Sequence, residues 1–98
     1  MMSSLPPPLR EVLDILAIAY PVGIGADEYY PVLLALYGDM SDENLAKVVA
    51  TFIQGEDVVV SNDIARAISM RTSLRSATER ATNRLLDAGW KPDEDDQS

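Results

Sequence analysis

The stretch DEYYPVLLALYG, residues 27–38, is the most informative segment of this chain. Apolar side chains occupy nearly every position from Tyr30 to Tyr37, so they cover almost the whole circumference of a helix. A helix that is apolar all round is normally buried by other elements. Asp27 and Glu28 would lie at its positive N-terminal end, and Gly38 would end it. The stretch therefore predicts a central helix in an all-α protein.

The segments on either side of this central helix have the spacing of amphipathic helices. Residues 9–20 carry apolar side chains at intervals of three and four, and Pro21 ends that pattern. Residues 42–53 carry a regular apolar stripe after Ser41, a good N-terminal cap, with Gly55 as the expected C-terminal cap. Each segment predicts a helix with one buried face.

A fourth, short helix is predicted after a run of three valines. Val58, Val59 and Val60 read as an extended segment that is too short and isolated to nucleate a sheet. Ser61 or Asn62 would then cap a helix that carries apolar residues up to position 68.

The last predicted helix ends in a glycine followed by the only tryptophan. Residues 76–79, SATE, have the spacing of a capping box and predict its start, and Gly89 would end it. Trp90 would fold back onto the last turn and pack on Leu85 or Leu86. The predicted fold class is all-α, a compact bundle of five short helices in a single domain. We assign residues 1–8 to an N-terminal lead-in segment, residues 9–92 to the five-helix bundle domain and residues 93–98 to an acidic, disordered tail.

Several of these segments together resemble a known family. They are LAIAYPVGIGADEYYPVLLAL at 16–36, SDENLAKVV at 41–49, NDIARAI at 62–68 and LLDAGWKP at 85–92. The chain is similar to the actinobacterial, mycobacterial-type family called domain of unknown function 3349 over nearly its whole length. The resemblance implies a monomeric bundle of five helices and an actinobacterial origin. It carries over no catalytic or ligand-binding residue. Gly25 and Ala26 depart from the more proline-rich link expected there.

The composition removes the usual means of catalysis. The 98-residue chain has no histidine and no cysteine, so the commonest general base and metal ligand and any thiolate metal site are absent. The acidic pairs at 27–28 and 42–43 fall at helix starts, where negative charge is favourable. The acidic run at 93–96 lacks the spaced ligands and turn glycine of a calcium loop. We therefore predict that the protein is not an enzyme and has no catalytic residue, cofactor or metal.

The chain has no convincing membrane or export segment. Its apolar run at residues 15–26 is interrupted by Pro21, Gly23 and Gly25 and is too short to span a bilayer. Glu11 and Asp14 lie where a signal peptide would need apolar residues. We predict a cytoplasmic protein without a membrane partner.

Charge is distributed unevenly along the chain. Residues 1–63 carry ten acids and two bases, whereas residues 64–91 carry six bases and two acids. The candidate interaction surface consists of the arginines of this basic segment: Arg66, Arg71, Arg75, Arg80 and Arg84. We predict a non-catalytic interaction or accessory module, monomeric, with an unknown protein partner.

Two other functions remain open from the sequence. The first is a nucleic-acid-binding, helix-turn-helix-like protein that uses residues 66–91. Three features disfavour it: Arg75 and Thr78 fall on apolar positions of the motif, Arg75 points about 140° away from Arg80 around the helix, and only an acidic tail follows Trp90, where a wing would need a hairpin. The net charge of −8 also works against a polyanion ligand. The second is a small-molecule carrier, which would need a cavity beside the helix that runs from Tyr30 to Tyr37.

Overall fold

The computed structural model describes residues 5–92, and within that range the chain forms five helices and no strand. This confirms the predicted fold class. No helix in the described range is long and apolar enough to cross a membrane. The helices are α1 (Pro7–Ala19), α2 (Ala26–Tyr37), α3 (Asp42–Ile53), α4 (Asp57–Ser69) and α5 (Arg75–Asp87).

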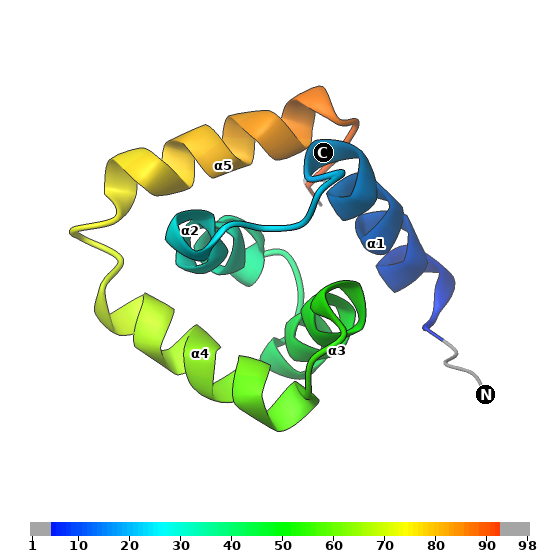
Figure 1. The fold of residues 1–98 in the computed structure, drawn as a ribbon, viewed down its shortest axis with the longest axis horizontal. Helices are drawn as coiled ribbons and strands as arrows, with labels where there is room; N and C mark the ends of the chain where they lie inside the picture. Colours follow the sequence, from blue (N-terminus) through cyan, green and yellow to red (C-terminus); the bar gives the residue numbers. More distant parts are fainter. Residues whose placement is uncertain (1–4, 93–98) are drawn as a thin grey trace, which may run out of the picture.

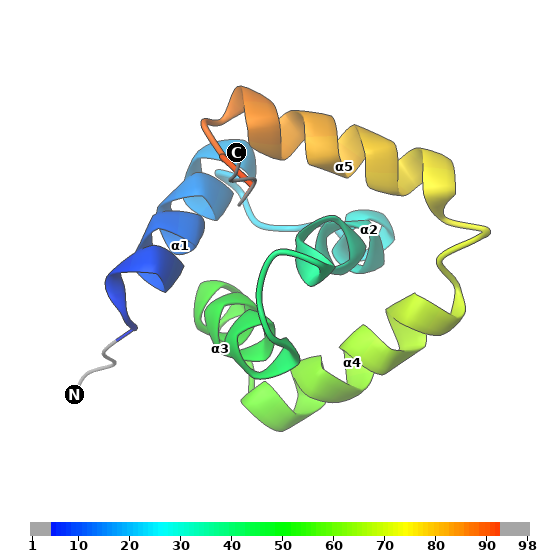
Figure 2. The ribbon, with the colours of Figure 1, turned by 180° about the vertical axis from the view of Figure 1, so that it is seen from behind.

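Helix α2 lies at the centre of the bundle, as its apolar circumference predicts (Figure 1). It packs against α3, α4 and α5, and α1 closes the remaining side by packing on α3 and α5. Val32, Leu33 and Leu36 of α2 are buried almost completely. The view from behind shows the same arrangement and the short connection that leads from α2 to α3 (Figure 2).

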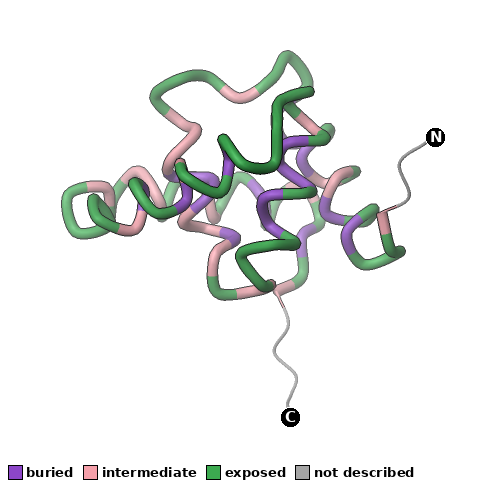
Figure 3. Tube along the Cα trace, turned by 90° about the horizontal axis from the view of Figure 1, so that it is seen from below, coloured by how far each residue is buried: buried purple, intermediate pink, exposed green. Residues whose placement is uncertain are grey.

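The buried residues of the described range are aliphatic or aromatic. Buried residues lie on the inward sides of the helices, and exposed residues lie outside them (Figure 3). No polar or charged residue of the described range is buried. The core side chains that are fully buried include Leu16, Leu33, Leu36, Leu45, Val48, Val49, Val60 and Leu85.

The predicted extended segment before α4 is wrong, because α4 begins at Asp57 and includes all three valines. Val60, Ile64 and Ala67 are its buried residues, so Val60 is the first member of a helical stripe with spacing four and three. The helix propensity of valine is only about 0.5 kcal/mol poorer than that of alanine, whereas burying its side chain contributes about 1.5–3 kcal/mol. Burial of Val60 therefore decides the conformation. Ser61 and Asn62 are exposed residues inside the helix and not its caps.

The predicted capping box of α5 is also wrong, because α5 begins at Arg75 without a side-chain cap. A capping residue needs extended backbone angles, but Leu74 has φ −101° and ψ 14°. The turn before α5 already has helical hydrogen bonds between residues four apart. The Leu74 N–H donates to Met70 O, and the Thr78 N–H donates to Leu74 O. The chain therefore enters α5 without the extended residue that a cap requires.

The end of α3 differs from the prediction by one residue. Gln54, and not Gly55, has the left-handed conformation, with φ 59°. The Gly55 N–H donates to Ala50 O at 2.9 Å, which closes the last turn. A Cβ at Gly55 would approach the side chain of Ile53 to 3.3 Å, which gives a packing reason for glycine at this position.

Two predicted helix caps are confirmed. The Asn44 N–H donates to Ser41 Oγ at 3.1 Å at the start of α3. After α5, Gly89 has φ 107°, and the Trp90 N–H donates to Leu85 O at 3.0 Å. With the bond from the Gly89 N–H to Leu86 O, this is a Schellman motif. Trp90 is buried at the end of α5, and the packing of its side chain on Leu85 or Leu86 stays a prediction.

Candidate functional site

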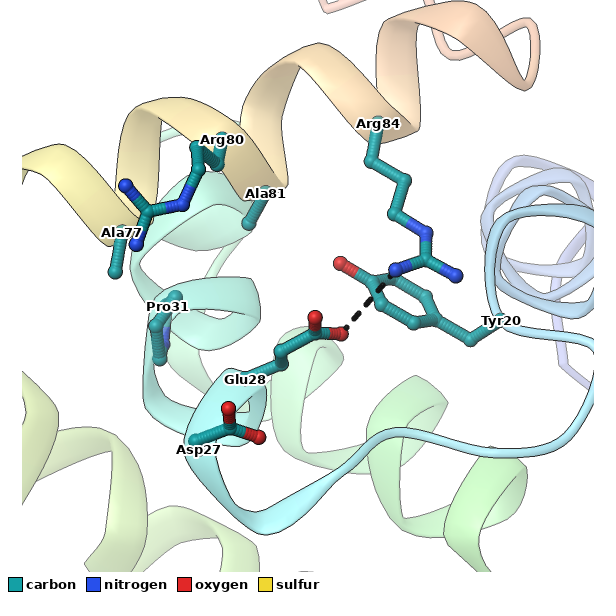
Figure 4. A pocket seen from close by; sticks show the side chains of 8 residues that line it. All are labelled: Tyr20, Asp27, Glu28, Pro31, Ala77, Arg80, Ala81 and Arg84. Atoms are coloured by element: carbon teal, nitrogen blue, oxygen red, sulfur yellow. Dashed lines mark hydrogen bonds and ion pairs between the residues drawn. The ribbon is translucent and has the colours of Figure 1, made fainter.

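Of the five predicted surface arginines, Arg84 is the one whose side chain forms a hydrogen bond, an ion pair and a ring contact with other described residues. Its Nε donates to Ala19 O at 2.7 Å, and its guanidinium carbon lies 4.3 Å from the centre of the Tyr20 ring. Its Nη1 lies 3.4 Å from Oε1 of Glu28 (Figure 4). These contacts tie α5 to the end of α1, whose negative dipole favours a cation, and to the first turn of α2. Arg84 therefore has a structural role.

A pocket of about 270 Å³ lies beside Arg84, between α5 and the first turns of α2. Arg80 and Arg84 line it from α5, Asp27 and Glu28 line it from α2, and Arg84 extends toward the carboxylate of Glu28 (Figure 4). Two guanidinium groups and two carboxylates cancel in charge, so the pocket does not select an anion. Burial, followed by the nearby Glu28 carboxylate, raises the pKa of Tyr20, so its hydroxyl stays neutral and is a poor base. The volume of the pocket beside Arg84 is below the usual lower limit of about 300 Å³ for ligand pockets.

The other predicted arginines lie elsewhere. Arg71 and Arg75 line a separate hollow of about 350 Å³ beside Leu34 and Tyr37. Arg66 is exposed on α4 and lines neither hollow. The structure thus brings Arg80 together with Arg84 and Arg71 together with Arg75, but it does not unite the five predicted residues in one site.

The arrangement of α4 and α5 differs from a helix-turn-helix. The two helices of that motif pack on each other across a short turn. Here α4 and α5 lie on opposite sides of α2, and each packs on α2 instead of on the other (Figures 1 and 2). The basic segment therefore lacks the geometry of that motif.

An apolar groove lies where α2, α3 and α4 meet, beside the start of the helix that a small-molecule carrier would need, and none of the five predicted arginines lines it. Its volume is about 520 Å³, and it is open to solvent. Ile53 and Val59 line it and are 40% and 51% exposed, although both are aliphatic. We call it the α2–α3–α4 groove, and it is lined by Ile24, Ala26, Tyr29, Tyr30, Ile53, Gly55, Glu56, Val59, Val60 and Asp63.

The signal for this groove was present in the valine run. Once Val60, Ile64 and Ala67 form the buried stripe of α4, Val58 and Val59 are surplus apolar residues on its outer side. Reading the run as extended concealed that surplus.

One wall of the groove is held by a hydrogen bond between α2 and α4. The Tyr29 hydroxyl donates to Oδ2 of Asp63 at 2.8 Å. Burial raises the pKa of Tyr29 well above its ordinary value, and the bond to Asp63 raises it further. Tyr29 is therefore a neutral donor at physiological pH, and Asp63 is held at the groove with a defined orientation.

The groove and pockets offer little for metal chemistry. The described residues contain no group of three or more histidine, cysteine, aspartate or glutamate side chains that could hold a metal ion. The acidic run at 93–96, interpreted above as a solvated tail, lies outside the described residues.

Comparison with known protein families identifies the family of this chain. The model of a family described as Protein of unknown function (DUF3349) matches residues 7–94, which include all five helices. Neither the curated proteins nor the solved structures contain a match to the chain. The family description names no activity.

Proposed function

We infer that the chain, which belongs to the family described as Protein of unknown function (DUF3349), is a non-catalytic interaction module that binds a protein partner through the α2–α3–α4 groove. The observation that carries this proposal is the exposure of Ile53 and Val59 together on one open groove. Covering an aliphatic side chain completely contributes about 1.5–3 kcal/mol. Because Ile53 and Val59 are each already about half buried, a partner that covers both gains about as much as from burying one aliphatic side chain completely, and further contacts have to supply the rest of its affinity.

The shape of the groove favours a polypeptide over a small molecule. Small-molecule sites usually enclose about 70–90% of the ligand surface, and an open groove leaves one side of any small ligand in water. A second polypeptide can bury the ends of a few side chains in the groove while the rest of it stays outside. The polar side chains among the described residues that line the groove are Tyr29, whose hydroxyl is already bonded to Asp63, Tyr30, and the carboxylates of Glu56 and Asp63. They form no nucleophile and base pair, which supports a non-catalytic role.

A capture experiment with paired valine variants tests the proposal. Immobilised wild-type protein, Val59→Ser and Val58→Ser are each incubated with lysate of the native cell, and retained proteins are identified by mass spectrometry. Val58 is the matched control, because it is 64% exposed on the same helix but does not line the groove. We expect a partner that Val58→Ser retains and Val59→Ser loses. The proposal would be contradicted if all three immobilised proteins retained the same partners equally. Robust turnover of a substrate by the purified protein in enzyme screens would also contradict it.

Nucleic-acid binding is the second candidate. It is favoured by the meeting of Arg71 and Arg75 at one hollow, where neither forms an ion pair with a described residue. Contacts between such arginines and the phosphates of a nucleic acid would give a binding affinity that falls steeply as the salt concentration rises. Duplex DNA titrated at low ionic strength should then shift the wild-type protein and not Arg71→Ala/Arg75→Ala. No shift at low salt would eliminate this candidate.

We propose a cytoplasmic location, since Glu11 and Asp14 interrupt the apolar pattern that an export signal needs. We also propose a monomer, which sedimentation analysis would test. The actinobacterial origin implied by the resemblance stays a prediction.

A further inference from the structure

We propose that the α2–α3–α4 groove binds a cationic amphipathic segment of another protein, whose apolar residues cover Ile53 and Val59 and whose lysines or arginines reach Glu56 and Asp63. This inference rests on the proposed function and names the chemistry of its partner.

The charge of the groove carries the inference. Among the residues that the structure describes, Glu56 and Asp63 are the only charged ones that line it, and no lysine or arginine does. Asp57 follows Glu56 directly on the chain. The N-terminus of α4 adds a partial positive charge of about 0.5, which is smaller than the charge of the two adjoining carboxylates. The groove therefore presents apolar surface beside net negative charge, and its complement is apolar with positive charge.

The hydrogen bond at the groove wall favours this partner further. Tyr29 occupies Oδ2 of Asp63 and thereby fixes the carboxylate on the groove. Oδ1 forms no hydrogen bond or ion pair with a described residue. A carboxylate that is already oriented loses less side-chain entropy when a lysine or arginine binds it.

Occupants from the chain itself fit the groove less well. Residues 93–98 carry four acids and no base, so they would be repelled by Glu56 and Asp63. Two copies joined groove to groove would bring the same carboxylates together, since a twofold contact uses one surface twice. Contact between the groove and the arginines of a second copy is the one self-association that charge allows, and the experiment below includes it.

The mode of binding follows from the shape. An amphipathic helix places apolar residues at i, i+3, i+4 and i+7 on one face, and such a face docks in an apolar groove. The probe is therefore a synthetic helical peptide with leucines at those positions and lysines at the others. Its comparison peptide keeps the leucines and replaces every lysine with glutamate.

Binding is measured by calorimetry or fluorescence anisotropy against the full chain and four variants. Val59→Ser removes apolar groove surface. Glu56→Gln/Asp63→Asn removes the groove charge. Asp42→Asn/Glu43→Gln is the matched control, because it removes the same charge from the opposite end of α3, roughly 15 Å along the helix. Val58→Ser is the control for Val59→Ser.

We expect the lysine peptide to bind and the glutamate peptide to show no binding. The Glu56→Gln/Asp63→Asn variant should bind about tenfold more weakly, as expected for the loss of two surface charge pairs. The Asp42→Asn/Glu43→Gln control should change the affinity less than about twofold, which reflects only long-range attraction screened by salt. Val59→Ser should weaken binding, and Val58→Ser should not.

Three outcomes would overturn the inference. Equal binding of the two peptides would show that charge does not select the partner. An equal loss in the groove pair and the control pair would show non-specific attraction to an acidic protein. Self-association in sedimentation that Val59→Ser abolishes would identify a second copy as the occupant. In each case Val59-dependent capture of a partner from lysate decides separately whether the groove is a docking site at all, so failure of the proposed function is distinguishable.

Discussion

The hydroxyl of Tyr29 donates a 2.8 Å hydrogen bond to the carboxylate of Asp63, which lies 34 residues later on a different helix. This bond joins α2 to α4 along one wall of the groove. The same pair of side chains therefore joins two helices and orients the Asp63 carboxylate that we propose binds a cationic partner.

Replacing Tyr29 with phenylalanine should destabilise the protein. The substitution keeps the ring but removes the donor, and a hydrogen bond to a charged group that is only part-buried contributes about 1 kcal/mol. Urea unfolding measures the free energy of unfolding. Tyr30→Phe is the control, because its hydroxyl forms no described hydrogen bond, and it should change the free energy by less than about 0.5 kcal/mol. A Tyr29→Phe value equal to the control would contradict the importance of the bond.

The raised pKa of Tyr29 predicts loss of stability in alkali. A tyrosine whose pKa is higher in the folded state stabilises that state below its unfolded pKa, whose ordinary value is 10.0. The contribution is lost as the pH rises above that value. Thermal unfolding followed by circular dichroism should therefore show a midpoint that falls above about pH 10. The fall should be smaller in Tyr29→Phe, while Tyr20, whose pKa is also raised, retains its share.

Arg84 should contribute more to stability than its partial exposure implies. Its guanidinium combines a hydrogen bond to Ala19 O with contact to the face of Tyr20. Arg84→Ala should lower the free energy of unfolding by about 1–2 kcal/mol, with the half-exposed ion pair to Glu28 adding little. Arg84→Lys should recover less than half, because an ammonium cannot supply a planar, stacked donor. Arg80→Ala, in the same pocket, should change it by less than about 0.5 kcal/mol.

Gln54 is a site where substitution should stabilise the fold. It has φ 59°, a conformation that disfavours side chains with a Cβ and favours glycine. Gln54→Gly should raise the free energy of unfolding by about 0.5–1 kcal/mol, after the greater chain entropy of unfolded glycine is subtracted. Gly55→Ala should change the free energy of unfolding by less than about 0.5 kcal/mol, because the lower entropy of the unfolded chain opposes the strain of a Cβ that would lie 3.3 Å from the Ile53 side chain. Denaturant midpoints of both variants check the pair.

The valines at the start of α4 should differ sharply from one another. Val60 is fully buried, and Val60→Ala should cost about 2 kcal/mol in transfer and cavity terms. Val58 is 64% exposed, and Val58→Ala should be neutral or slightly stabilising, since alanine is the better helix former. An equal effect at both positions in urea unfolding would contradict a helix that begins at Asp57.

Local signals allowed most of the fold to be predicted. The apolar circumference of residues 30–37 predicts the central helix, and Ser41 and Gly89 mark helix ends, because these effects act between neighbouring turns. The start of α4 was mispredicted because the low helix propensity of valine, a few tenths of a kcal/mol, is outweighed by the burial of Val60. The start of α5 was mispredicted because the turn before it is already helical and leaves no extended residue to act as a cap.

The sequence by itself determined that this protein is an acidic, all-helical bundle with its α2 segment inside. Only the tertiary structure decided which charges and apolar residues are available at the surface. Arg84 finds its acceptor on Ala19, 65 residues away, and Asp63 finds its donor on Tyr29. Partners so distant in sequence leave no periodic pattern, because their meeting depends on how the helices pack around α2. The same packing leaves Ile53 and Val59 exposed on one groove.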